Sequence, residues 1–209
     1  MSLPDEEKHN TIGSILGQKG YGKSFLTKQI ARMSPRVIAI DNLGEYNDLH
    51  VITGYRESID AVAKCESLGK FQLALRTSSV EEDLELMELV RHLSHFLLIV
   101  EEASRYVSTA YLPEPLEYLI RFGRHRAIDQ IYLARRATEL HRDITAQSDY
   151  IVSFRQHEFA DVKRLEHDMG EIALSAKDLP KFECIVYGED TALPWPVLER
   201  KYQVEHDSS

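Results

Sequence analysis

The stretch Gly17-Gln18-Lys19-Gly20-Tyr21-Gly22-Lys23-Ser24 matches the pattern GxxxxGKS at every fixed position. An apolar, β-prone run precedes it at 11–16, and a helical pattern follows at 23–33. A Gly-rich loop between a strand and a helix is the usual context of a Walker A motif. Its glycines can take positive φ, so the backbone N–H groups turn inward and surround phosphate oxygens at the positive end of the helix. The stretch therefore predicts a nucleotide phosphate site.

Single residues of this loop have expected roles. Lys23 occupies the position that reaches the β- and γ-phosphates, and Ser24 occupies that of the hydroxyl that ligates Mg²⁺. The predicted cofactors are therefore ATP and Mg²⁺. The residues expected to contact ATP are Gly17, Gln18, Lys19, Gly20, Tyr21, Gly22, Lys23, Ser24 and Phe25.

A second motif lies at 96–102, where five apolar residues end in Glu101 and Glu102. The run suits a central parallel strand, and its acidic end forms a Walker B pattern. Hydrolysis needs one acid to hold Mg²⁺ and a second to orient or deprotonate the attacking water. We assign Glu101 to the metal and Glu102 to the water. Carboxylates at sheet edges are common, so this assignment depends on the Walker A loop upstream.

Short apolar segments alternate with helical segments of about a dozen residues along the chain, which predicts an α/β fold with a mostly parallel central sheet flanked by helices. The expected strands are 11–16, 37–40, 71–77, 96–100, 131–134 and 150–154, and the expected helices are 23–33, 56–68, 81–95, 116–122, 138–147 and 158–169. Segments 184–187 and 196–198 are expected to form a terminal antiparallel pair or a strap.

Asp41 and Glu45 follow the expected strand at 37–40. Ligands of open α/β sheets bind at the carboxyl ends of strands, so these carboxylates can belong to the site. Acidic residues also stabilise turns and helix caps. The sequence leaves both interpretations open.

The composition is that of one globular domain, with 209 residues of which 43% are apolar and 28% charged. We expect a single domain over 1–209, with a core at about 11–155 and a C-terminal extension at about 156–209. The longest apolar run is far shorter than the roughly 20 residues that span a bilayer, and residues 1–10 lack the apolar core of a signal peptide. Two widely separated cysteines fit a reducing compartment. We expect a cytoplasmic protein without membrane insertion of its own.

The net charge of −9 argues against a protein coated uniformly in basic residues. Between Arg121 and Arg142, however, there are six arginines and only two acidic residues. The chain therefore concentrates positive charge in one segment.

With these segments placed, the chain resembles the FtsK/HerA superfamily of DNA-pumping P-loop ATPases, and especially the compact genome-packaging ATPases of membrane-containing viruses. Beyond the Walker motifs, 37–46 looks like the family's second strand with its acidic and aromatic end. Segment 121–128 is similar to the Arg- and Gly-containing segment before the sensor strand, and 131–140 and 144–155 follow the sensor strand and the strand after it. The likeness spans most of residues 11–155.

This resemblance implies an ATP-hydrolysing translocase that pumps double-stranded DNA into a capsid. It implies a hexameric ring in which an arginine reaches the ATP of a neighbouring subunit, and the candidates for this finger are Arg124 first, then Arg121 and Arg126. With no barrel or anchor before the first strand, the chain is expected to dock on a capsid or virion-membrane protein. The expected location is the host cytoplasm or the virion.

Two positions depart from the family pattern. The metal acid is usually Asp, whereas this chain has Glu101. The sensor residue is usually Gln, whereas alignment gives Arg135, which cannot accept a hydrogen bond from water but can contact the γ-phosphate. We therefore include Arg135 among the catalytic residues, with Lys23, Glu102 and Arg124.

Other functions also fit the motifs. A small nucleotide or metabolite kinase would use the arginine-rich segment as a phosphate-clamping lid, although the paired Glu101 and Glu102 favour transfer to water. A poorly hydrolysing nucleotide switch fits the two departures. A filamentous-phage assembly ATPase would carry a membrane span, which the sequence lacks.

Overall fold

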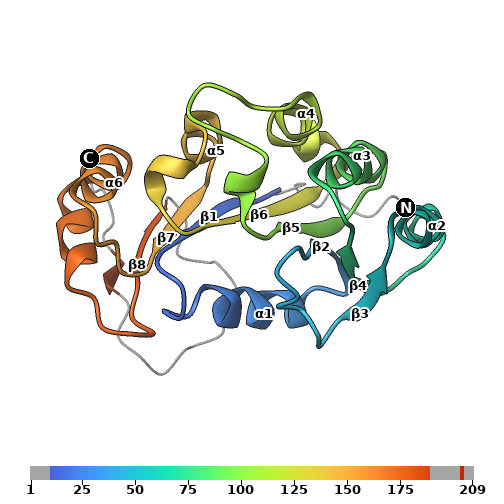
Figure 1. Cartoon of the computed structure of the whole chain (residues 1–209), viewed down its shortest axis with the longest axis horizontal. Coiled ribbons are helices and arrows are strands. Elements are labelled where there is room, and N and C mark those ends of the chain that lie inside the picture. The colour runs from blue at the N-terminus through green and yellow to red at the C-terminus, as the bar shows by residue number, and fades with distance from the viewer. Residues whose placement is uncertain (1–9, 189–202, 205–209) are drawn as a thin grey trace, which may run out of the picture.

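The computed structural model describes residues 10–188 and 203–204, which form a nine-stranded sheet in the order β3-β4-β2-β5-β6-β1-β7-β8-β9 (Figure 1). The strands are β1 (Ile12–Leu16), β2 (Arg36–Ile40), β3 (His50–Thr53), β4 (Phe71–Arg76), β5 (Phe96–Val100), β6 (Ile128–Ala134), β7 (Tyr150–Ser153), β8 (Ile185–Gly188) and β9 (Gln203–Val204). The α-helices are α1 (Lys23–Met33), α2 (Tyr55–Cys65), α3 (Val80–Val90), α4 (Glu114–Phe122), α5 (Arg142–Ala146) and α6 (Phe159–Met169). Short 3₁₀ turns are η1 (Ala103–Arg105), η2 (Gly123–Arg126), η3 (Ala137–Glu139) and η4 (Gly170–Lys177).

Strands β1 to β7 are all parallel, and β8 runs antiparallel to β7. The predicted α/β class is therefore confirmed. Because β6 lies between β1 and β5, the loops that follow these three strands meet at the carboxyl ends of the strands, which we call the carboxyl edge of the sheet. The carboxyl edge carries the Walker A loop, the two glutamates and Arg135.

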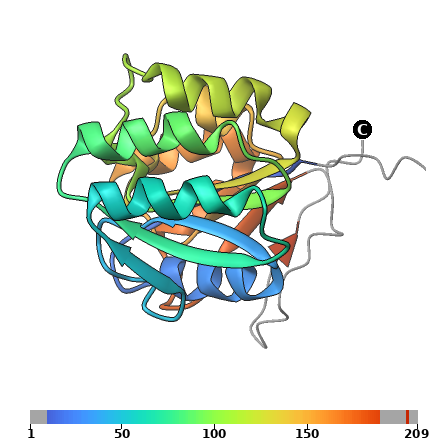
Figure 2. The same cartoon turned by 90° about the vertical axis from the view of Figure 1, so that its right-hand side faces the viewer.

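Helices cover both faces of the sheet. Helix α1 lies on one face, and α3, α4 and α5 lie on the other (Figure 1). The view in Figure 2 shows α1 beneath the sheet and α2, α3 and α4 above it. Neighbouring residues of a strand enter opposite core clusters, so that Leu98 of β5 packs on one side and Ile99 on the other. This two-sided burial explains the continuous apolar runs of the central strands.

Several element boundaries differ from the sequence prediction, among them the end of α2, at Cys65, and the start of β6, at Ile128. The strand β3 was not predicted, and the predicted helix at 81–95 ends earlier, at Val90. The predicted helix at 138–147 divides into η3 and α5. Segment 184–187 corresponds to β8, which pairs antiparallel with β7 and parallel with β9, while 196–198 lies outside the described residues. Among the helices that the structure describes, none combines the length and apolar character needed to cross a membrane.

Candidate active site

The Walker A loop leaves the sheet between the ends of β6 and β7. The Gly17 N–H donates to the Ala134 carbonyl and the Gln18 N–H to the Arg155 carbonyl, each at 3.2 Å. The predicted positive φ angles are confirmed, at +141° for Gly17, +80° for Gly20 and +119° for Gly22. At Gly17 a Cβ atom would lie 2.5 Å from the Cβ of Phe154, so the close approach to β7 itself requires glycine. Helix α1 begins at Lys23, and its first-turn N–H groups therefore face the loop.

Lys23 is held inside the loop that precedes it. Its Nζ donates to the carbonyl of Gly17 at 2.6 Å and to that of Gln18 at 3.3 Å. Burial lowers the pKa of this ammonium, and the neighbouring carboxylates of Glu101 and Glu102 oppose that shift. The Lys23 ammonium is thus close to the two predicted catalytic acids.

Glu101 follows the last residue of β5 and is only 2% exposed. The hydroxyl of Tyr46 donates to its Oε2 at 2.9 Å. Burial raises the pKa of Glu101 to about 7, although the Tyr46 hydrogen bond and the charge of Lys23 favour the ionised form. A buried carboxylate that is this poorly solvated gains from a cation, and Ser24 supplies a hydroxyl oxygen in the same cavity.

These oxygen donors fit Mg²⁺, which usually takes one or two protein ligands and completes its shell with phosphate oxygens and water. Within the described residues there is no group of three or more His, Cys, Asp and Glu side chains that could hold a metal ion alone. Glu101 and Ser24 could hold a Mg²⁺ whose remaining ligands are phosphate oxygens and water.

Glu102 is held by Arg135, the residue that follows β6. The Arg135 Nε lies 3.0 Å from Oε1 and 3.2 Å from Oε2 of Glu102. Glu102 has a left-handed backbone, with φ 48° and ψ 54°, a conformation that costs a non-glycine residue about 1 kcal/mol or more. The turn after β5 thereby directs neighbouring carboxylates to different partners, Glu101 to Tyr46 and Glu102 to Arg135.

One cavity of about 430 Å³ brings most of the predicted site residues together. Its lining consists of Lys19, Gly20, Gly22, Lys23, Ser24, Phe25, Leu43, Glu45, Glu101, Glu102, Arg135 and Phe182. Gly17, Gln18 and Tyr21, which were also predicted to contact ATP, are not part of this lining. The Tyr21 hydroxyl instead accepts a hydrogen bond from Arg155 Nη1 at 3.3 Å.

The two open interpretations of the acids after β2 resolve differently. Asp41 is fully buried, accepts the N–H groups of Glu45 and Tyr46, and forms a 2.7 Å ion pair with Arg76, so it stabilises the turn. Glu45 lines the cavity.

Sequence reasoning missed Phe182, Leu43 and the Tyr46 hydroxyl as parts of this site. Tyr46 had a signal, because it belongs to the acidic and aromatic end of the second strand. Phe182 had none, since it lies in the C-terminal extension, far along the chain from the loop that it contacts.

The three finger candidates lie at the amino ends of the strands, the amino edge of the sheet. They belong to the end of α4 and to η2, before β6, whereas Arg135 follows β6. The seven residues of β6 separate these edges by roughly 23 Å. Arg121 forms ion pairs with Glu117 and Asp143, and Arg126 donates to the His92 carbonyl. The Arg124 side chain, by contrast, has no hydrogen bond or ion pair within the described part of the chain.

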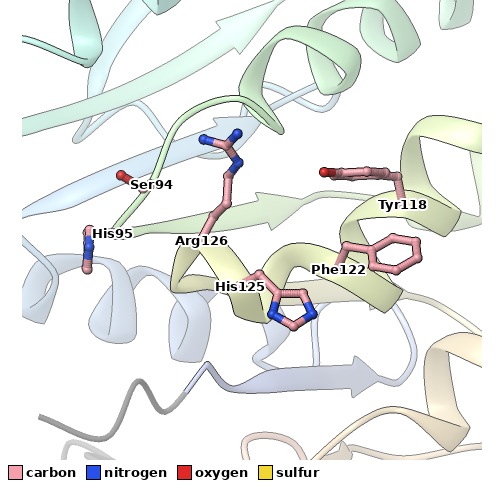
Figure 3. Close-up of a pocket in the computed structure, with 6 residues that line it drawn as sticks. All are labelled: Ser94, His95, Tyr118, Phe122, His125 and Arg126. Atoms are coloured by element: carbon pink, nitrogen blue, oxygen red, sulfur yellow. The ribbon is translucent and has the colours of Figure 1, made fainter. Parts of the chain in front are cut away.

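A second cavity, of about 530 Å³, opens at this edge (Figure 3). Its lining comprises Tyr118 and Phe122 of α4, His125 and Arg126 of η2, and Ser94 and His95 before β5. None of the residues assigned to the nucleotide lines it. This second cavity therefore lies at the amino edge of the sheet, with the finger candidates, and is separate from the phosphate site.

Solved structures share this fold. The genome packaging NTPase B204 from Sulfolobus turreted icosahedral virus 2, in complex with ATP-gammaS, gives a TM-score of 0.69 at 19% identity, over 86% of this chain and 92% of that chain. The DNA-packaging ATPase B204 from Sulfolobus turreted icosahedral virus gives 0.64 at 21% identity, over 85% and 92%. VirB4 of Thermoanaerobacter pseudethanolicus gives 0.56 at 12% identity, over 86% and 87%. The expected resemblance to packaging ATPases is thus confirmed at the level of the fold, while no protein-family model and no curated protein sequence matches the chain.

Proposed function

We propose that this protein is an ATP-hydrolysing motor that translocates double-stranded DNA, with genome packaging into a viral capsid as its task. The observation that carries the proposal is the single cavity that joins the Walker A loop to Glu101, Glu102 and Arg135. Among the solved structures with the same fold are genome-packaging NTPases and ATPases, some of them in complex with ATP analogues.

Five residues of the cavity have a proposed task in hydrolysis: Lys23, Ser24, Glu101, Glu102 and Arg135. The loop N–H groups and Lys23 would bind the β- and γ-phosphates, and Glu101 with Ser24 would hold Mg²⁺, which neutralises charge on the phosphates when bound. Glu102 would accept a proton from the attacking water. The water oxygen forms a bond to the γ-phosphorus, and the bond between the γ-phosphorus and the β–γ bridging oxygen breaks, so ADP leaves. Arg135 lines the same cavity and is paired with Glu102, so we assign to it a contact with the γ-phosphate. A kinase would instead have to exclude water from a site that contains this base.

The separation of the two edges supports a ring. Arg124 is roughly 23 Å from the edge that holds Arg135, so it can act only on a nucleotide held by a neighbouring subunit. Its side chain has no partner among the described residues, unlike those of Arg121 and Arg126. A hexamer with one Arg124 at each interface would complete the site, and its other basic groups would contact DNA phosphates.

The test is phosphate release from ATP and Mg²⁺, with and without long double-stranded DNA, across a range of protein concentrations. We expect stimulation by DNA and a rate per chain that rises with concentration. Arg124→Ala should reduce the rate of hydrolysis by about a thousandfold or more, as expected for an arginine finger supplied in trans by a neighbouring subunit. Arg121→Ala is the matched control, because it removes an exposed arginine of the same edge whose ion pairs are internal.

Mixing two inactive variants tests the direction of the contact. Lys23→Ala retains Arg124 but lacks a working loop, and Arg124→Ala retains the loop but lacks the finger. A mixture should recover activity that neither variant has alone. Hydrolysis by the wild type that is indifferent to DNA and to concentration would contradict the proposal and favour a monomeric kinase or switch.

A further inference from the structure

We propose that Phe182, from the C-terminal extension, is the stacking surface for the nucleobase, with Phe25 and Leu43 supplying further apolar surface in the same cavity. The inference depends on the nucleotide site proposed above and extends it to the base. All three side chains line the same cavity as the phosphate loop. They are 48%, 52% and 45% exposed respectively, so much of their apolar surface is in contact with solvent.

The chemistry of the cavity lining is of two kinds. Lys23, Glu101, Glu102 and Arg135 supply charge, whereas Phe25, Leu43 and Phe182 supply apolar and aromatic surface. A nucleoside triphosphate has the same division, because its phosphates are charged and its base is a flat aromatic ring. Base-binding surfaces generally use aromatic side chains, on which every base can stack.

Phe182 is fixed to the phosphate loop rather than simply lying near it. Its N–H donates to the Tyr21 carbonyl at 3.0 Å, and its ring is so close to Gly22 that a Cβ at that glycine would lie 3.2 Å from the ring. Arg155 fastens the same region, since its Nη1 donates to the Tyr21 hydroxyl and its Nε to the Lys177 carbonyl. The ring therefore has a defined position beside the first turn of α1.

The backbone of Phe182 has a φ of +67°, in the left-handed region that bulky residues rarely adopt. An asparagine or glycine would accept this conformation with less strain. Exposed aromatic residues alone need no explanation, and Phe159 is an example that is 80% exposed. An aromatic ring that is strained, partly exposed and joined to the phosphate loop is different, because strained residues of this kind concentrate at ligand sites.

Stacking also predicts which nucleotides are affected. Phenylalanine and leucine side chains have no hydrogen-bonding groups, so they contact the face of a base without reading its edge. The contribution of Phe182 should therefore be similar for adenine and guanine nucleotides and absent for a ligand without a base.

The experiment measures binding by titration calorimetry with Mg²⁺ and three probes: a non-hydrolysable ATP analogue, the matching GTP analogue and inorganic tripolyphosphate. Phe182→Ala should weaken both nucleotides by about tenfold and leave tripolyphosphate unchanged. Phe182→Tyr should restore wild-type binding because it keeps the ring. Phe159→Ala is the control for loss of an exposed aromatic side chain.

Each outcome distinguishes the two proposals. Wild-type nucleotide affinity in Phe182→Ala would overturn the stacking role and leave the ATPase assignment intact. Equal weakening of tripolyphosphate would also overturn it, because the residue would then act through the loop. A wild-type protein that binds neither nucleotide nor tripolyphosphate would refute the nucleotide site itself.

Discussion

Glu102→Gln gives the sharpest test of the catalytic assignment, because it removes the proposed base without changing the size of the side chain. This carboxylate has two roles in the proposal: it accepts the proton of the attacking water, and it holds Arg135 at 3.0 Å. An amide cannot take the proton of the attacking water. We therefore expect a protein that binds ATP but hardly turns it over.

The two roles differ in magnitude. Loss of a general base reduces the rate by about 10² to 10⁴, which is roughly 3 to 5 kcal/mol in the barrier. The ion pair with Arg135 is worth at most about 1 kcal/mol, because the arginine side chain is 48% exposed. The unfolding temperature should therefore fall by no more than about 4 °C. Release of Arg135 toward the phosphates should keep ATP affinity at the wild-type value or raise it by up to about fivefold.

The assay combines steady-state phosphate release with ATP binding and thermal unfolding on the same preparation. Glu45→Gln is the matched control, because Glu45 lines the same cavity from the turn after β2. Its turnover should remain close to that of the wild type. Turnover of Glu102→Gln near the wild-type rate would refute the assignment of the base, and loss of ATP binding would show that the carboxylate supports the site rather than the reaction.

Three further predictions concern the residues around this base. Burial raises the pKa of Glu101 to about 7, so the folded protein retains a proton that the unfolded chain releases above its ordinary pKa of 4.5. The protonated carboxyl of Glu101 therefore stabilises the fold fully below pH 4.5, and this stabilisation is lost as the pH rises through 7. Glu101→Gln, which stays uncharged, should be more stable than the wild type by about 3 kcal/mol in thermal unfolding at pH 8. The difference should shrink toward pH 5. Arg76→Ala leaves the buried carboxylate of Asp41 without its cation and should reduce the free energy of unfolding by about 3 kcal/mol, while calorimetry on the folded protein finds unchanged ATP affinity. Lys23→Ala should weaken ATP binding by about a hundredfold, because it removes a charge-assisted contact to the phosphates, and unchanged binding would refute the Walker A assignment.

The parts of the site that the sequence predicted are those that depend on short stretches of chain. The loop, its three positive φ angles and the bounds of α1 at 23–33 all follow from Gly, Lys and helix-forming residues within a few turns of one another. The Walker B strand was equally local, since its five apolar residues are buried on both faces. Here the chemistry of neighbouring residues decides the structure.

The parts that sequence reasoning missed depend on which strands are neighbours. The ion pair of Arg135 with Glu102 exists because β6 lies beside β5, and no local pattern encodes that order. Phe182 reaches the loop because β8 pairs back onto β7. Strand β3 was missed because its four residues lie at the sheet edge and none is fully buried, so it lacks the apolar run that identified the central strands.

Strand β6 gives the proposed ring a direct connection between adjacent nucleotides. Its carboxyl end leads into Arg135, beside Glu102 of the same subunit, and its amino end follows η2, which carries Arg124. The strand is hydrogen-bonded on both sides, to β1 and to β5, so it is a rigid element that fixes η2 relative to Arg135. If Arg135 exchanged Glu102 for a γ-phosphate, a displacement of β6 together with its neighbouring strands would move Arg124 at the neighbouring interface. Arg135→Gln should therefore alter not only hydrolysis in its own subunit but also the rescue that wild-type neighbours give to Arg124→Ala subunits in mixed rings.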